Sequence, residues 1–270
     1  MRVLVTNDDG IDAPGLHALA LALDEAGYDI LVVAPDRNHS GYGAAIGDLG
    51  SGGSALELAP ATVPGAEHLP AWGLVGPPAL CVMAARLGGF GAPPDLVVAG
   101  VNPGNNTGRA VLHSGTVGAV LTGANLGVSG VAVSVAEDPE PHFAAAATVA
   151  VAAVGWVVTA PARTILNVNA PHAGLDDVRG VRWAELAPFG TVRATLDPVG
   201  DDRLEFGLAE TAVELPADSD TALVNAGYVA VTTLSPIRAA EWEPVAAEVE
   251  RRLAAGPAAR RHRPPAGETA

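Results

Sequence analysis

Apolar and polar segments alternate along the chain in a pattern typical of α/β proteins. Continuous apolar runs predict buried strands at 2–6, 30–34, 95–99, 131–135 and 164–168, with one more at 228–234. Apolar residues at helical spacing predict helices between them, at 14–26, 79–87, 114–127 and 142–157. Strands without polar alternation are covered on both faces, so the pattern predicts an α/β fold with a mostly parallel sheet.

The remaining segments predict smaller parts of the fold. Residues 47–70 are rich in Gly, Ser and Pro, which favours an irregular or hairpin excursion. Short alternating segments with turn signals predict a small β-rich appendage at about 180–235, and 239–253 predicts a closing helix. We therefore expect a main domain at 1–235, a C-terminal helix within 236–255 and a disordered tail at 256–270.

Polar loops follow three of the predicted strands directly. They are Asn7-Asp8-Asp9-Gly10, the segment 35–41 and the glycine-rich segment 100–108. Because ligands of parallel sheets bind beyond the carboxyl ends of the strands, we expect these loops to meet at one edge. The sequence therefore predicts a functional site there.

Asp8 and Asp9 suggest a site for a hard cation, because neighbouring carboxylates repel each other unless a metal or a network of donors neutralises them. Mg²⁺ and Mn²⁺ prefer oxygen ligands from one or two carboxylates, neutral groups and water. Asp8 and Asp9 would supply the charge, Ser40 a hydroxyl and Asn102 an amide oxygen. Such an ion would polarise a phosphoryl oxygen and activate a water molecule.

The predicted helix at 114 offers a place for phosphate, because helix N-termini carry free backbone N–H groups. Ser114-Gly115-Thr116 places a hydroxyl on each side of a glycine, with Ser114 as the expected N-cap. Asn106 in the preceding loop can donate to phosphate oxygens. His39 is the first candidate for the general acid, and His113 is the second.

Composition excludes several other functions. The chain has 30 acidic and 15 basic residues, and its net charge of −15 disfavours binding to long nucleic acids. All basic residues other than histidine are arginines, so Schiff-base chemistry and a P-loop lysine are excluded. A basic leader and a membrane-length apolar run are both lacking, so we expect a cytoplasmic protein without a membrane partner. The single cysteine, Cys81, is expected to be a buried filler.

The motifs resemble those of the SurE family. They are Thr6-Asn7-Asp8-Asp9-Gly10, the segment 34–41, Asn102 with its glycine loop, and Ser-Gly-Thr-Val-Gly at 114–118. Segments 167–169 and 220–232 also match, so the resemblance covers roughly residues 1–235. It implies a Rossmann-like three-layer core and a C-terminal element that is swapped in homodimers or homotetramers. It also implies a metal-dependent phosphomonoesterase that hydrolyses nucleoside 5'- and possibly 3'-monophosphates.

The resemblance assigns roles to the polar residues. It implies that one divalent ion per subunit, Mg²⁺ or Mn²⁺, is held by Asp8, Asp9, Ser40 and Asn102, and that Asn106 and Ser114 to Thr116 face the phosphate. The expected catalytic residues are Asp8, Asp9, Asn106 and His39.

Three departures from the family pattern leave other substrates and functions open. Leu80 and Arg109-Ala110 stand where the family has acids, and Tyr42-Gly43-Ala44-Ala45 replaces a polar segment. An added arginine favours a substrate with more negative charge, such as a specialised phosphorylated metabolite. A non-catalytic, metal-dependent nucleotide-binding protein is another alternative. An aspartyl-phosphate phosphatase is a third, although its aspartates are usually separated by one residue and it needs a distant basic group.

Overall fold

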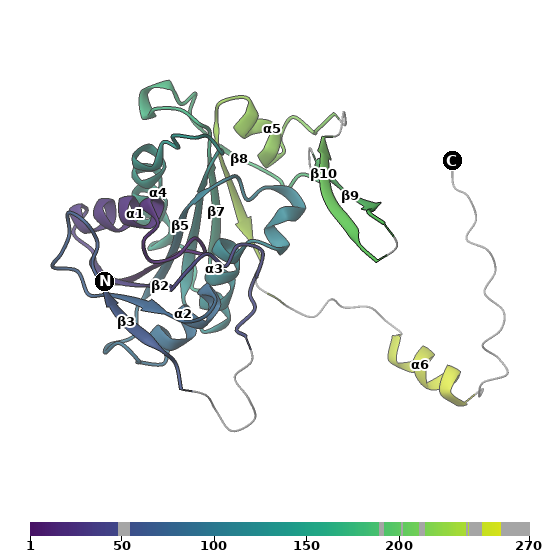
Figure 1. Ribbon diagram of the computed structural model, residues 1–270, viewed down its shortest axis with the longest axis horizontal. Coiled ribbons are helices and arrows are strands. Elements are labelled where there is room, and N and C mark those ends of the chain that lie inside the picture. The colour runs from purple at the N-terminus through teal and green to yellow at the C-terminus, as the bar shows by residue number, and fades with distance from the viewer. Residues whose placement is uncertain are drawn as a thin grey trace. The chain divides into compact units, whose positions relative to one another are not determined.

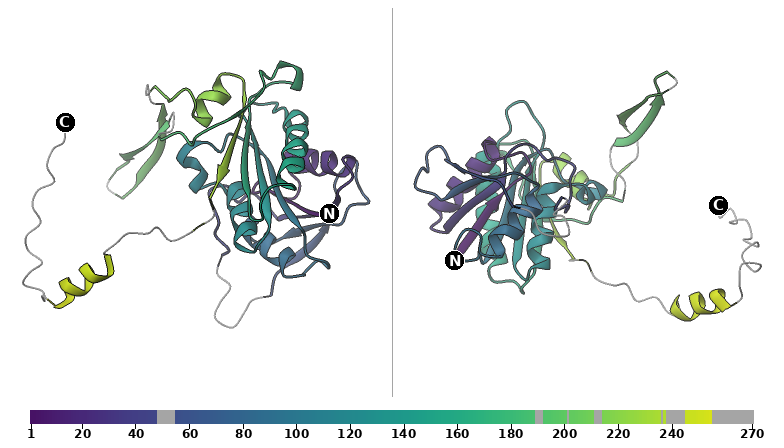
Figure 2. Two further views of the ribbon diagram at one scale, coloured as in Figure 1. Left: turned by 180° about the vertical axis from the view of Figure 1, so that it is seen from behind. Right: turned by 60° about the horizontal axis from the view of Figure 1, so that its bottom comes forward.

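A computed structural model describes the chain over most of its length (Figures 1 and 2). The described residues are 1–47, 55–188, 192–200, 202–210, 214–235, 237 and 245–254. They fall into two compact units, Met1–Pro236 and Ile237–Ala270. The predicted tail at 256–270 and the first residues of the predicted closing helix lie outside the described residues.

The described part of the first unit contains a nine-stranded sheet of order β3-β4-β2-β1-β5-β6-β7-β11-β8. The six strands from β4 to β7 in this order run parallel, whereas β3 is antiparallel to β4 and β11 is antiparallel to β7. The edge strand β8 runs parallel to β11. The strands are β1 (Arg2–Thr6), β2 (Asp29–Pro35), β3 (Leu58–Ala61), β4 (Ala71–Leu74), β5 (Leu96–Pro103), β6 (Ser129–Val135), β7 (Ile165–Ala170), β8 (Val181–Trp183) and β11 (Val229–Leu234).

Helices cover both faces of this sheet, as Figures 1 and 2 show. Helices α1 (Pro14–Glu25) and α4 (Phe143–Val157) pack with one face in the larger apolar cluster. Helices α2 (Pro78–Arg86) and α3 (Gly115–Asn125) pack with the other face in a second cluster, which includes Cys81. Because the central strands are buried on both faces, their sequences are mostly apolar and do not alternate between apolar and polar residues. The predicted α/β fold with a mostly parallel sheet is confirmed.

One strand differs from the prediction in a way that matters for the site. Residues 100–103 were expected in a polar loop, but they belong to β5. The pairing of β5 with β6 is irregular between Ala99 and Asn102 and then resumes, with Asn102 opposite Ser134. Gly and Pro in this segment indicate a loop by composition, whereas the neighbouring strand keeps it in the sheet.

The C-terminal part of the first unit is only partly separate from the main sheet. Strands β9 (Val192–Pro198) and β10 (Leu204–Glu210) form an antiparallel hairpin, while β8 and β11 extend the main sheet. The separate β-rich part is therefore smaller than the predicted range of 180–235. Helix α5 (Asp220–Asn225) precedes β11, and short 3₁₀ helices lie at Gly108–Leu112 and Leu175–Asp177.

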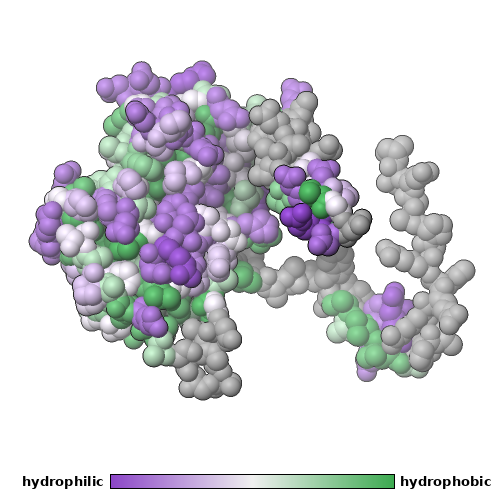
Figure 3. All heavy atoms as spheres, in the orientation of Figure 1, coloured by the Kyte–Doolittle hydropathy of each residue, from purple (hydrophilic) through white to green (hydrophobic). Residues whose placement is uncertain are grey.

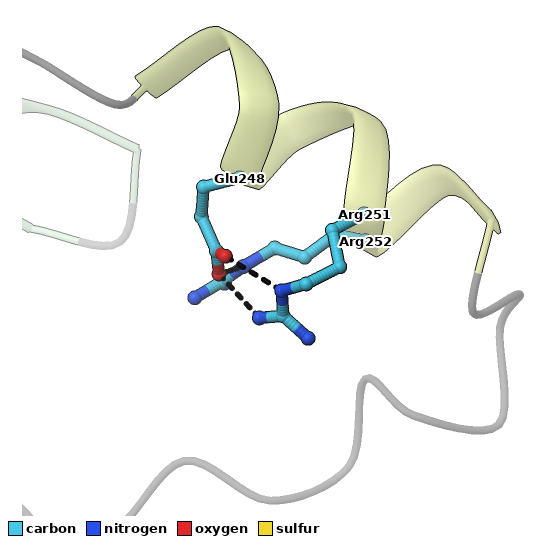
Figure 4. A network of polar contacts seen from close by, with 3 residues as sticks. All are labelled: Glu248, Arg251 and Arg252. Carbon is cyan, nitrogen blue, oxygen red and sulfur yellow. Dashed lines mark hydrogen bonds and ion pairs between the residues drawn. The ribbon is translucent and has the colours of Figure 1, made fainter.

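In the second unit, the described residues include helix α6 (Val245–Ala254). Figure 4 shows Glu248 paired with Arg251 and Arg252 on this helix. Hydrogen bonds from Arg251 and then Arg252 lower the pKa of Glu248 to about 2. Val249 is exposed on the same helix, so charged and apolar side chains both face solvent there, as Figure 3 shows. Among the described helices, none combines the length and the apolarity that crossing a membrane requires.

Candidate active site

The predicted polar segments follow neighbouring strands at one edge of the sheet. Strand β1 lies between β2 and β5, and Thr6 of β1 is in register with Ala99 of β5. Asp8 lies two residues after Thr6, and Asn102 lies three residues after Ala99. The segment that contains Ser40 follows Pro35, the last residue of β2. The turn after β1 is fixed by Asn7, whose side chain donates to Gly10 O and accepts from Gly10 N at 2.9 and 3.2 Å.

Asp8 is buried and held by the start of α3. The Thr116 hydroxyl donates to Asp8 Oδ1 at 2.5 Å, and Gly115 N donates to Asp8 Oδ2 at 3.1 Å. A Cβ atom at Gly115 would lie 2.7 Å from Asp8 Oδ2, so the close approach requires glycine. The positive end of the helix dipole also favours a carboxylate here. Gly115 and Thr116 therefore fix Asp8, a role that the sequence did not predict, and their direct binding of phosphate stays a prediction.

Asp9 has no such support. Its Oδ2 atom is buried and makes no hydrogen bond within the described residues. Burial, and then the neighbouring charge of Asp8, raise the pKa of Asp9 from 3.8 to about 7. A carboxylate that has a buried oxygen without a donor among the described residues, and that costs free energy to ionise, fits a place where a cation supplies the missing charge.

The donors around the two aspartates suit a hard cation. The described residues contain no group of three or more His, Cys, Asp or Glu side chains that could hold a metal ion, so a cation here would need neutral oxygens and water as well. Asn102 Nδ2 donates to Gly104 O at 2.6 Å, and its Oδ1 carries no hydrogen bond in the described structure. Ser40 is exposed. Among the described contacts, no hydrogen bond joins Ser40 or Asn102 to either aspartate, so their role as metal ligands stays a prediction.

A cleft of about 410 Å³ opens on one side of Asp9. Asp12, Asp36 and Arg37 contribute charged groups to its wall, and Phe143 lies among its apolar residues. Phe143 packs against the apolar cluster of α1 and α4, whereas Asp8 contacts α3. Of the two neighbouring carboxylates, Asp8 therefore contacts the helix α3 on one side of the sheet, and Asp9 faces the cleft next to α4 on the other.

The loop after β2 brings His39 to the site through its backbone. His39 N donates to Asp8 O at 2.7 Å. The ring is 6% exposed, its Nε2 lies 3.6 Å from Asp36 Oδ1, and it contacts the Tyr42 ring edge-on at 4.9 Å between centroids. Neither ring nitrogen makes a hydrogen bond among the described residues. The second candidate acid, His113, is exposed.

The loop before α3 holds Asn106 in a buried polar network. Asn106 N donates to Asn169 Oδ1 at 2.8 Å, and Asn106 Nδ2 donates to Ser134 Oγ at 2.8 Å. Asn106 O accepts from Asn167 Nδ2 at 2.8 Å and from Asn169 Nδ2 at 3.2 Å. Ser114 caps α3 as predicted, because its side chain accepts from Val117 N at 3.1 Å.

Asp220 fixes the other end of this loop, and sequence reasoning assigned it no role. Its fully buried carboxylate accepts from Gly108 N at 2.8 Å, from Ala187 N at 3.0 Å and from Thr221 N at 2.8 Å. These backbone donors compensate the burial of the charge. Two features of the sequence could have indicated these buried polar contacts. They are the asparagines within the apolar strand β7 and the Ser-Asp pair at the start of α5.

Comparisons with known proteins agree on the family to which this chain is similar. A family model described as "Survival protein SurE" matches residues 3–190. A "5'/3'-nucleotidase SurE" of Serratia proteamaculans is 36% identical over 241 residues, covering 87% of this chain and 90% of that protein. A "5'-nucleotidase SurE" of Synechococcus is 36% identical over 244 residues, covering 87% and 92%.

A solved structure, the SurE protein of Aquifex aeolicus, has the same fold. It matches with a TM-score of 0.76 and 27% sequence identity, and the match covers 94% of this chain and 100% of that one. The family model spans more than half of the chain, and the relatives are similar over most of their length. The chain therefore belongs to the SurE family.

Proposed function

We propose that the protein is a phosphomonoesterase that hydrolyses nucleoside 5'-monophosphates, and also 3'-monophosphates, to nucleoside and phosphate. SurE nucleotidases are in general metal-dependent, and the similar proteins are named as nucleotidases. The observation that carries the proposal is the contrast between the two aspartates. Both carboxylate oxygens of Asp8 accept hydrogen bonds from α3, while Oδ2 of Asp9 is buried at the same sheet edge and has no donor among the described residues.

The proposed metal is a single Mg²⁺ or Mn²⁺ ion held by Asp8, Asp9, Ser40 and Asn102. A bound divalent ion would polarise the phosphoryl group and lower the pKa of the attacking water. Asp9 would release its proton on cation binding, because the cation removes the cost of ionising a buried carboxylate. Calorimetry with Mn²⁺ should therefore show binding to the wild type and weaker binding to Asp9→Asn.

The chain's own residues supply the remaining groups in this proposal. Asn106 has one amide hydrogen bonded to Ser134, and its second amide hydrogen can donate to a phosphate oxygen. Ser114 caps α3 with its hydroxyl oxygen, and its hydroxyl hydrogen can donate in the same way. His39 is proposed to give a proton to the leaving nucleoside oxygen.

The cleft beside Asp9 supports a nucleotide substrate. Apolar groups including Phe143 suit the faces of a base, and the carboxylates of Asp12 and Asp36 can accept from base amino or ribose hydroxyl groups. Binding of the nucleoside part of the substrate in this cleft would orient the phosphate for reaction and so raise the rate of hydrolysis.

Phosphate release from nucleoside 5'- and 3'-monophosphates and from p-nitrophenyl phosphate tests the proposal. The wild type should be active with Mg²⁺ or Mn²⁺ and inactive with chelator, and Asp8→Asn should be inactive with either metal. Asp29→Asn is the matched control, because this aspartate is exposed at the start of β2, at the opposite end of the strand from the site. Activity that persists with chelator and in Asp8→Asn would contradict the proposed mechanism. Nucleotide binding without phosphate release would indicate the non-catalytic alternative.

Arg109 supports a second candidate substrate class with more than one anionic group. It is exposed, and only its Nε is committed among the described contacts, donating to Pro188 O at 2.7 Å. The rest of the guanidinium can bind another phosphate or carboxylate. The ratio of hydrolysis rates for a bisphosphate and a monophosphate should fall in Arg109→Asp, and an unchanged ratio would remove this candidate.

We also propose that the protein is a cytoplasmic homodimer or homotetramer. The hairpin of β9 and β10 exposes Leu196, Leu204 and Phe206 at 58%, 63% and 70%, and the edge strand β8 exposes Trp183 at 61%. Apolar side chains of this size on short strands favour association with a second copy. Light scattering on the purified protein should give a mass above that of one chain, and a monomer would contradict this assembly.

A further inference from the structure

The sheet face that packs on α2 and α3 changes from apolar to polar at the carboxyl end of β6 and β7. Ala132 of β6 is in register with Asn167 of β7, and Ser134 is in register with Asn169. Asn102 of β5 is in register with Ser134, so a polar row crosses three strands. Ser134, Asn167 and Asn169 are each 0% exposed. Buried polar groups are costly unless they are hydrogen-bonded, so their partners show what this row does.

The partners of these side chains converge on one residue, Asn106. The carboxamide of Asn169 accepts from the N–H of Asn106 and donates to its carbonyl oxygen, as a neighbouring strand would. Asn167 donates to the same carbonyl oxygen. Ser134 accepts from the side-chain amide. Both the backbone and the side chain of Asn106 are therefore fixed by residues that lie far from it in sequence.

We infer that Ser134 and Asn169 are positioning residues that hold Asn106 in the orientation needed for catalysis. This inference rests on the proposed function, in which Asn106 donates to the phosphate. Asn106 is 9% exposed, and its amide oxygen and second amide hydrogen make no further hydrogen bond within the described structure. An amide held by a buried acceptor cannot rotate freely, so its remaining hydrogen keeps one direction before substrate arrives.

A purely structural role explains the network less well. The loop is already attached at Gly108, where Asp220 accepts a backbone hydrogen bond, and at Ser114, which caps α3. Apolar residues at the carboxyl ends of β6 and β7 would stabilise the core without the cost of burying polar groups. The bond from Asn106 Nδ2 to Ser134 fixes a side chain rather than the backbone of the loop, as expected for a group that must be aimed.

A double-mutant cycle with Ser134→Ala and Asn106→Ala tests the inference, using AMP and p-nitrophenyl phosphate as substrates. Ser134→Ala should lower kcat by about tenfold or more, because the amide can then rotate away. In the Asn106→Ala background, the same change should lower kcat by less than about twofold, since the residue through which Ser134 acts is already missing. Equal factors in both backgrounds would show a role independent of Asn106 and would overturn the inference.

A matched control separates this effect from general damage to the core. Thr232 is 5% exposed on β11, opposite Asn167, and its hydroxyl donates to Ala184 O at 3.0 Å. Thr232→Val also removes one buried hydroxyl and should leave kcat within about twofold of wild type. A loss of kcat in Thr232→Val as large as in Ser134→Ala would count against the inference.

A second variant keeps the test decisive if Ser134→Ala does not fold. Asn169→Asp retains the acceptor for the N–H of Asn106 but places an oxygen against its carbonyl, so the same non-additive loss of kcat with Asn106→Ala is expected. Full activity of Asn106→Ala, in a preparation where Asp8→Asn is inactive, would overturn the inference and leave the proposed function intact. A wild type that hydrolyses no phosphomonoester would remove the proposed function itself.

Discussion

Replacing Asp9 by asparagine should stabilise the metal-free protein at neutral and alkaline pH. The Asp9 carboxyl group is partly buried, has an oxygen without a hydrogen-bond partner among the described residues, and stands beside the charged Asp8. Asparagine has nearly the same shape and no charge. The substitution therefore removes the cost of ionisation and leaves the packing of the loop unchanged.

The sign and size follow from the pKa of Asp9, which is raised from 3.8 to about 7 in the folded state. Between these values the folded protein keeps a proton that the unfolded chain has released, so the free energy of unfolding falls as the pH rises through this window. A shift of about three units corresponds to about 4 kcal/mol. Water screens this partly exposed side chain, so a net effect of about 2 kcal/mol is expected above pH 7.

Thermal unfolding in chelator from pH 4 to pH 8 measures this effect. Wild type and Asp9→Asn should unfold at similar temperatures near pH 4, and the variant should unfold about 4–8 °C higher at pH 8. Asp12→Asn, with its exposed side chain in the same loop, should show no such trend. Added Mn²⁺ should raise the unfolding temperature of the wild type more than that of Asp9→Asn. A difference between the two proteins that does not change with pH would refute the reasoning.

Two further pairs of substitutions test the packing around the site. Thr116→Val removes the hydroxyl that donates to Asp8 and should lower phosphatase activity about tenfold or more. Thr122→Val on the same helix removes a hydroxyl that donates to Gly118 O and should leave the activity unchanged. Gly118→Ala would place a Cβ atom 2.1 Å from the carbonyl oxygen of Gly43, so it should lower stability by about 1–3 kcal/mol in denaturant unfolding. Gly155→Ala, with no atom within 4 Å of the added carbon, should instead stabilise its helix by about 0.5–1 kcal/mol. A Gly118→Ala variant at least as stable as the wild type would contradict the close packing of α3.

Local sequence signals predicted the strands β1, β2, β5, β6, β7 and β11 and the sheet edge at which the polar segments meet. A run of apolar residues followed directly by polar ones marks both a buried strand and its exposed end, as Val3 to Thr6 and then Asp8 illustrate. The cap of α3 is also local, because Ser114 needs only the backbone of Val117. These features depend on residues that are close in sequence, so one chain is enough to predict them.

Long-range contacts of the site could not be predicted in the same way. Asp8 and Thr116 are separated by 108 positions, and Asn106 and Asn169 by 63. Such pairs depend on strand order and register, which the apolar pattern of parallel strands does not specify. The continuation of β5 to Pro103 has the same origin, because pairing with β6 overrides a composition typical of loops.

The unequal treatment of the two aspartates has a physical consequence for metal selectivity. Donors of α3 already compensate Asp8, so the binding of a cation relieves repulsion mainly at Asp9. Without further acidic, histidine or cysteine ligands among the described residues, most other ligands must be neutral oxygens or water. Mg²⁺ and Mn²⁺ accept such a shell, whereas Zn²⁺ in structural sites prefers nitrogen and sulfur ligands. The charge that we expect to weaken the metal-free fold is therefore the same one that leads us to propose a hard cation at this sheet edge.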